Sequence, residues 1–267
     1  MQGRFSAEIG LWGLIHGSLF VPDGKGNAIE TRDNLDLLLS ALSKKIESGG
    51  LKSVGVEFAP DYLKEWRALM PLLKAQKDPT RISIPLDGRK LMETPFWPVI
   101  ERIAVGECRG NLNHAMRRFT IAVYSARLIN FLDAKGVKII ALGNKAMTVR
   151  SRRISNLVED GVLPKEANYQ GALEQDEMVE TKIAALKRKK RLPQVLLAGA
   201  NHLVELGERL EHHGIKCDSR LLYPENLPTG LLDWKSYLIA RDHILRQRKQ
   251  EKTKPRTTPK KPQAHRV

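Results

Sequence analysis

Residues 193–214 read PQVLLAGANHLVELGERLEHHG, and this stretch predicts how the chain folds. An apolar run over residues 195–198 meets two small residues, Gly199 and Ala200, and a helical pattern begins directly after them. This order is typical of a buried strand that turns straight into a helix. His202 follows the strand, at the edge where an open α/β sheet usually binds its ligands.

The same local pattern occurs near the start of the chain. Residues 13–16 (GLIH) and residues 199–202 (GANH) both have the form G-x-x-H, and an apolar segment precedes each. Glycine lets the backbone turn tightly at a strand end, so that an imidazole there can point into the cleft above the sheet. If the two strands are neighbours, His16 and His202 converge.

The remainder of the chain alternates between strand and helix patterns. Strands are expected at residues 9–20 (ending near His16), 53–58, 82–86, 137–143, 195–198 and 218–223. Helices are expected at residues 35–46, 60–73, 172–190, after residue 202 and at 234–245, with a mostly helical middle section at 91–131 and a loop or short helix at 156–167. This alternation predicts one α/β domain over residues 1–245, with a mainly parallel central sheet covered by helices.

The positive charge of the chain is concentrated at its end. Residues 246–267 hold nine Lys or Arg residues and one acid, Glu251, and so contribute +8 of the formal net charge of +15. Three prolines and almost no apolar residues accompany them, so this segment is expected to be a disordered basic tail. Such a tail attaches weakly to nucleic acid or an anionic surface, or it only keeps the protein soluble.

Two cysteines, Cys108 and Cys217, form neither a disulfide framework nor a zinc ribbon by their spacing, and both are expected to be inert thiols. No run of 18 apolar residues is present, and Glu8 stands where a signal peptide would be apolar. We therefore expect a soluble protein of a reducing compartment, the cytoplasm.

A carboxylate joins the two histidines as a candidate site residue. Glu57 ends the apolar strand pattern at residues 53–58, so three strand ends supply His16, His202 and Glu57. These are ligand types that Zn²⁺, Mn²⁺ or Co²⁺ accept, and an open coordination position would hold a water for hydrolysis. The alternative is that each histidine is a hydrogen-bonded structural residue.

At these residues the sequence resembles the TraB/PrgY, GumN and TIKI group, which is similar in turn to the ChaN and erythromycin-esterase fold. The resemblance covers residues 10–225 and lies in the two G-x-x-H motifs, the dipeptide Val56-Glu57, the acidic residues 176–178 (DEM) and the motif LLAGANHL. It implies a metal-dependent protease or peptide-inactivating protein whose site contains His16, His202 and Glu57.

Two departures from the group's pattern concern arginine. An arginine commonly follows the glutamate closely, but Asp61 and Tyr62 stand there and Arg67 is the first arginine of that helix. An arginine also usually precedes the acid of the long helix, where this chain has Gln175 before Asp176. Asp176 is expected to position a histidine or contact substrate, the alternative being an ordinary surface acid.

The leading hypothesis is a metal-dependent hydrolase of a peptide or ester bond, with Arg150 and Arg153 as basic residues that contact the substrate. A second hypothesis is a non-catalytic protein on the same scaffold that binds a peptide or an anionic ligand. A third is a nucleic-acid-associated accessory protein that uses the basic tail.

Overall fold

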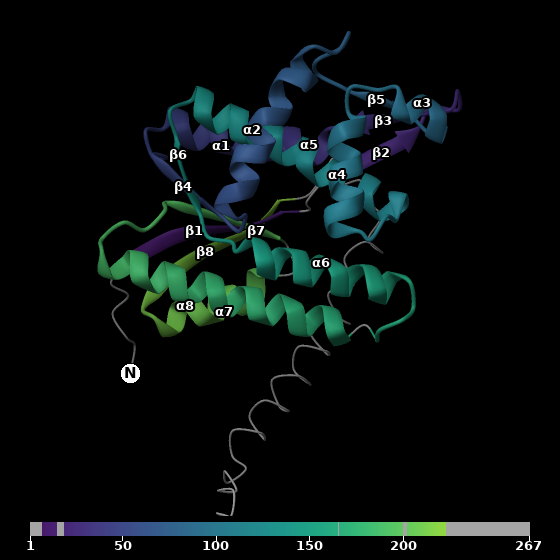
Figure 1. The fold of residues 1–267 in the computed structure, drawn as a ribbon. Coiled ribbons are helices and arrows are strands. Elements are labelled where there is room, and N and C mark those ends of the chain that lie inside the picture. Colours follow the sequence, from purple (N-terminus) through teal and green to yellow (C-terminus); the bar gives the residue numbers. More distant parts are fainter. Residues whose placement is uncertain (1–6, 15–18, 165, 200–201, 223–267) are drawn as a thin grey trace, which may run out of the picture.

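The computed structural model describes residues 7–14, 19–164, 166–199 and 202–222. A five-stranded sheet with the order β6-β4-β7-β1-β8 lies at its centre, and neighbouring strands pair in parallel. Its strands are β1 (Ala7–Leu14), β4 (Ser53–Val56), β6 (Lys138–Ala141), β7 (Val195–Gly199) and β8 (Ile215–Leu222). The predicted fold class, an α/β fold with a mainly parallel central sheet, is confirmed (Figure 1).

Helices cover both faces of this sheet. The helices of the described residues are α1 (Asp33–Glu47), α2 (Pro60–Lys74), α3 (Gly88–Met92), α4 (Trp97–Glu107), α5 (Leu112–Ala134), α6 (Lys145–Glu159), α7 (Glu166–Arg188) and α8 (Leu203–His212). Figure 1 shows α1, α2 and α5 on one side and α7 and α8 on the other, with α6 alongside α7.

The central strand β7 is buried on both faces, as its unbroken apolar sequence predicts. Val195 and Leu197 pack in a core cluster with α1, α2 and α5, whereas Leu196 and Ala198 pack in a second cluster with α7 and α8. Side chains alternate between the faces of a strand, so one short segment joins the two layers.

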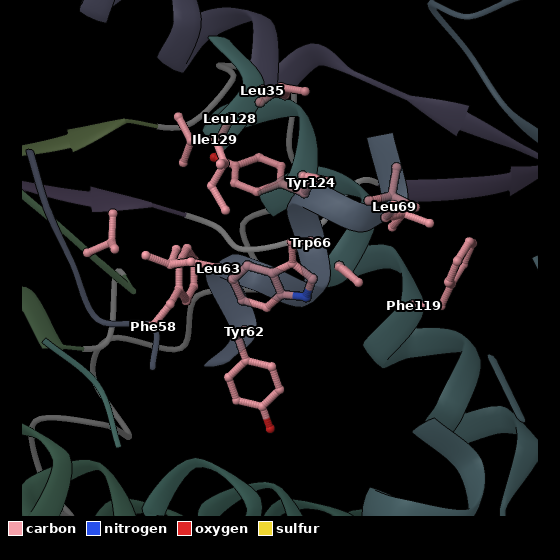
Figure 2. Close-up of a cluster of buried hydrophobic side chains, with 14 of the residues drawn as sticks. Leu35, Phe58, Tyr62, Leu63, Trp66, Leu69, Phe119, Tyr124, Leu128 and Ile129 are labelled. Atoms are coloured by element: carbon pink, nitrogen blue, oxygen red, sulfur yellow. The ribbon is translucent and has the colours of Figure 1, made fainter. Parts of the chain in front are cut away.

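An aromatic group closes the larger core beside the end of β4 (Figure 2). The rings of Tyr62 and Trp66 stack with centroids 5.3 Å apart, and Phe58 meets Trp66 edge-on at 4.6 Å. Figure 2 shows the Tyr62 ring directed away from the cluster, with its hydroxyl at the far end. The position of the polar end of Tyr62 is therefore set by the packing of α2.

A small antiparallel sheet was not predicted. The apolar pattern at residues 9–20 indicated one strand, but β1 ends at Leu14 and β2 (Leu19–Pro22) pairs instead with β3 (Asn27–Thr31), which pairs with β5 (Ser83–Pro85). The turn is built around Asp23, whose side chain accepts hydrogen bonds from the backbone of Lys25 and Asn27. The expected edge position of the strand that contains Pro85 is confirmed.

The segment before the long helix is shorter than expected. Residues 156–167 were expected to be a loop or short helix, but α6 continues to Glu159 and α7 begins at Glu166, which leaves the loop at residues 160–164. Asn156 is the one buried side chain of α6, so this helix contributes little to the core.

The described residues include no helix long and apolar enough to cross a membrane. The predicted helix at 234–245 and the basic tail at 246–267 lie outside the described residues.

A buried ion pair fixes the small sheet to the helical layer. Arg127 of α5 donates to both carboxylate oxygens of Glu30 on β3, at 3.0 and 2.7 Å, and to the carbonyl of Pro79 at 2.7 Å. The Glu30 side chain is fully buried and that of Arg127 is 8% exposed. The backbone N–H of Ile82 also donates to Glu30, so one carboxylate connects three segments.

We predict that Glu30→Gln lowers the free energy of unfolding by about 3–5 kcal/mol, because it leaves the buried Arg127 charge without its counter-ion. Urea denaturation measures the loss. Arg67→Met is a matched control, because Arg67 makes a similar two-bond pair with Asp133 but both side chains are more than 40% exposed. It should cost less than about 1 kcal/mol, and equal losses in the two variants would contradict the prediction.

Candidate active site

The strands that precede the three candidate ligands are neighbours in the sheet. The order β4-β7-β1 places the ends of these strands at one edge, with Leu14 of β1 opposite Gly199 of β7 and Val56 of β4 opposite Leu197. Glu57 directly follows β4, and His202 follows β7 at the start of α8. His16 follows β1 but lies outside the described residues, so its approach to His202 stays a prediction.

The His202 ring lies between two carboxylates. Its Nδ1 atom is 2.7 Å from Oδ1 of Asp176, and its Nε2 atom is 3.9 Å from Oε2 of Glu57. The Glu57 carboxylate is held in turn by the backbone N–H of Gly199, which donates to Oε2 at 3.1 Å. The structure therefore brings Glu57, His202 and Asp176 together from β4, β7 and α7.

Asp176 is buried, although a surface position stood as the alternative from sequence. Its side chain is 1% exposed, and Oδ2 has no hydrogen-bond partner among the described residues. The spacing of α7 contains the signal for this burial, because Leu173, Asp176, Val179 and Ile183 all fall on its buried stripe. An acid on an apolar stripe needs a partner, which His202 provides.

The two groups of this pair change each other's protonation. Burial raises the pKa of Asp176 above its ordinary value, against the attraction of the His202 imidazolium. Burial alone would lower the pKa of His202, but the charge of Asp176 and the hydrogen bond to it, helped by Glu57, raise that pKa to about 9. The pair thus keeps its proton to a higher pH than either group would in water.

A glycine positions Glu57 through close backbone packing. The N–H of Gly143, just after β6, donates to the carbonyl of Phe58 at 2.9 Å. A Cβ atom at residue 143 would lie 2.1 Å from the carbonyl oxygen of Glu57 and 2.5 Å from the carbonyl carbon of Phe58. Any larger residue must therefore displace the backbone that carries Glu57.

The side chains of Glu57, Asp176 and His202 line a cavity of about 190 Å³ at this edge of the sheet. It is lined by Glu57, Phe58, Tyr62, Arg118, Ile121, Thr148, Ser151, Arg152, Ser155, Gln175, Asp176, Met178, Val179, His202 and Leu206. The lining comes from the segment after β4 and from α2, α5, α6, α7 and α8, so both helical layers contribute to it.

Arg152 is held against the aromatic group in this cavity. Its guanidinium lies 4.7 Å from the centroid of the Tyr62 ring, donates to the Tyr62 hydroxyl at 3.3 Å and forms an ion pair with Glu107. The Tyr62 hydroxyl donates to Glu107 at 3.0 Å, and burial raises the pKa of Tyr62. Tyr62 and Arg152 are therefore fixed polar groups of the cavity.

The arginines predicted to contact substrate do not line the cavity. Arg150 is 67% exposed and lies 3.3 Å from Glu174, and Arg153 donates to the carbonyl of Gly106. Arg152 lies between them in sequence but on the cavity side of α6. Which arginine faces the cavity depends on its position around the helix, and the sequence pattern did not predict a helix here. Sequence reasoning also missed Arg118 of α5.

Among the residues that the structure describes, no group of three or more His, Cys, Asp or Glu side chains is arranged to hold a metal ion. Both cysteines have a pKa raised by burial, to about 12 for Cys217, as expected of inert thiols. Comparisons of the chain with protein-family models, curated proteins and solved structures gave no match. The functional conclusion therefore rests on the site.

We predict that Gly143→Ala lowers the free energy of unfolding by about 1–3 kcal/mol, because the added methyl overlaps the backbone after β4. Chemical denaturation measures this loss. Gly106→Ala is the control, since Gly106 lies within α4 with no atom within 4 Å of an added Cβ. It should raise stability by about 0.5–1 kcal/mol, and a neutral Gly143→Ala would contradict the close approach.

We also predict that Asp176→Asn lowers the pKa of His202 from about 9 to its ordinary 6.5 or below, because burial then acts without its compensating charge. An NMR titration of the imidazole in metal-free protein measures the change. Glu177→Gln, at an exposed neighbouring position, should leave the pKa of His202 near 9. A pKa near 9 in Asp176→Asn would show that the pair does not set it.

The same pair has a consequence for stability. The folded-state pKa of His202 lies above its ordinary value of 6.5. The protonated His202 therefore contributes its full stabilisation of the fold below pH 6.5, and this stabilisation is lost as the pH rises through about 9. The stability of Asp176→Asn should depend less on pH over that window.

Proposed function

We propose that the protein is a metal-dependent hydrolase of a peptide or ester bond, related to the TraB/PrgY, GumN and TIKI group. One observation carries this proposal: the His202 ring is held by Asp176 through Nδ1 and presents Nε2 to Glu57, inside a cavity at the carboxyl edge of the sheet. Open α/β sheets bind their ligands at this edge.

The two described donors fit a divalent ion. Nitrogen and oxygen ligands lie about 2.0–2.2 Å from Zn²⁺, so two ligands of one tetrahedral ion stand roughly 3.3–3.6 Å apart. The distance between His202 Nε2 and Glu57 Oε2 is 3.9 Å, so a small rotation of either side chain would bring both atoms to this spacing. A carboxylate on the other ring nitrogen is the usual partner of a metal-bound histidine, and Asp176 occupies that place. His16 is the proposed third ligand.

The residues of the chain have distinct roles in this proposal. His202, Glu57 and His16 would hold a divalent ion, which would supply an activated water at neutral pH. Asp176 is a positioning residue, because it fixes the orientation of the imidazole and keeps Nε2 directed at the cavity. The Arg152 guanidinium lines the same cavity and supplies hydrogen-bond donors for the substrate carbonyl as negative charge develops on it.

A second candidate is a non-catalytic binding protein on the same scaffold. The cationic side chains Arg118 and Arg152 in the cavity favour an anionic ligand for it. Binding of a metal and metal-dependent turnover distinguish the two candidates.

We predict that dialysed protein binds one equivalent of Zn²⁺, Mn²⁺ or Co²⁺, and that His202→Ala weakens binding by more than about 100-fold and abolishes peptide or ester hydrolysis. Calorimetry measures binding, and mass spectrometry of a peptide and ester pool measures turnover. His16→Ala tests the third ligand in the same way.

His212→Ala is the matched control, because His212 is an exposed histidine at the end of the helix that follows His202. It should leave metal affinity and turnover unchanged. If the wild type binds none of the three ions, or if His202→Ala binds them as well as His212→Ala does, the metal-dependent mechanism is wrong.

A further inference from the structure

Arg118 projects from α5 into the cavity that holds His202 and Glu57. Its Nη2 atom donates to Oδ1 of Asn156 at 3.2 Å and, at 3.5 Å, to the carbonyl of Arg152. Its Nε atom is buried and has no hydrogen-bond partner in the described parts of the chain. The hydrogen-bond acceptors that Arg118 contacts are both neutral oxygens.

The nearby carboxylates are already paired with other cations. Glu107 forms its ion pair with Arg152, and Glu159 forms one with Arg117 on the neighbouring position of α5. Burial, and the positive charge of Arg152, lower the pKa of Arg118, but a guanidinium still stays protonated. A largely buried cation beside neutral oxygens is costly, and an anion entering the cavity would remove that cost.

The proposed function limits which anion can enter the cavity. A peptide or an N-acyl amino acid carries a single carboxylate at its C-terminal end. The cavity volume of about 190 Å³ is below the roughly 300–1,000 Å³ of typical ligand pockets. The end of a chain fits this space better than the middle of an extended peptide.

We propose that Arg118 binds the free C-terminal carboxylate of the substrate, so that the cavity accepts a peptide or an N-acyl amino acid by its end. This inference rests on the proposed function and names its substrate class. A carboxylate can receive two parallel hydrogen bonds from one guanidinium, and this pairing would give Arg118 an anionic hydrogen-bond partner.

The reaction implied is removal of the terminal residue. Water adds across the terminal amide, its oxygen joins the carbonyl carbon and the C–N bond breaks. The nitrogen keeps a proton from that water, and the products are a shortened acid and a free amino acid. Arg118 would make a substrate contact at the end of the chain, away from the bond that is cleaved.

Binding to metal-free protein tests this assignment without turnover. The probes are N-acetyl-dialanine as the free acid and as its C-terminal amide, titrated by NMR chemical shift. The acid should bind at least about tenfold more tightly than the amide, since one charge-assisted pair distinguishes them. Arg118→Met should remove this difference while the affinity for the amide stays unchanged, and Arg118→Lys should keep part of it.

Arg117→Met is the matched control, because Arg117 is the adjacent arginine, is 68% exposed and does not line the cavity. It should retain the wild-type preference for the acid. Equal affinities of the wild type for acid and amide would overturn the proposal, even if Arg118→Met fails to fold. Tighter binding of inorganic phosphate than of the acid would overturn the carboxylate assignment.

The two proposals fail separately. A preference for the acid that depends on Arg118, without hydrolysis under any added metal, supports carboxylate binding and contradicts the hydrolase. Metal-dependent hydrolysis of the acid and the amide at the same rate supports the hydrolase and contradicts the role of Arg118.

Discussion

The hydrogen bond between Asp176 and His202 is the constraint on which the rest of the site depends. It joins the middle of α7 to the segment after β7, and so it fixes the covering helix against the central strand. It also sets the direction of the imidazole, because the ring nitrogen that faces Asp176 determines that the other one faces Glu57. A buried carboxylate is costly without a partner, so each residue of the pair requires the other.

The cavity exists because α6 does not pack on the sheet. Helices α1, α2 and α5 bury one face and α7 and α8 the other, whereas α6 buries only Asn156 and lies alongside α7 (Figure 1). Its polar side chains are therefore available at the edge where the strands end. Arg152 from this helix reaches Tyr62 of the opposite layer, so that the two layers are connected by polar contacts across the cavity.

Sequence patterns predicted the central sheet well because β1, β4, β6 and β7 lie in apolar runs that alternate with helical patterns. They missed β2, which lies in the same apolar run as β1 but belongs to a different sheet, and they missed α6, whose sequence is rich in basic residues. At the site, strand-end position was enough to find Glu57 and His202. Arg118 and Arg152 could not be predicted, because their role depends on which helices face each other across the cavity, a long-range property that no local pattern contains.

Tyr62 holds Arg152 at the site, although Arg152 is far from Glu57 in the sequence. In the resembling group an arginine follows the glutamate, whereas here Arg67 is bound to Asp133 on the surface and cannot serve. Tyr62 instead stacks on Trp66 and offers its ring face to the guanidinium of Arg152, while Glu107 neutralises that charge. The packing of Tyr62 against α6 thus places the Arg152 guanidinium at the cavity, with Glu107 as its counter-ion. Because a contact with substrate requires a position in space and not a position in the chain, the departure in sequence does not by itself contradict the proposed function.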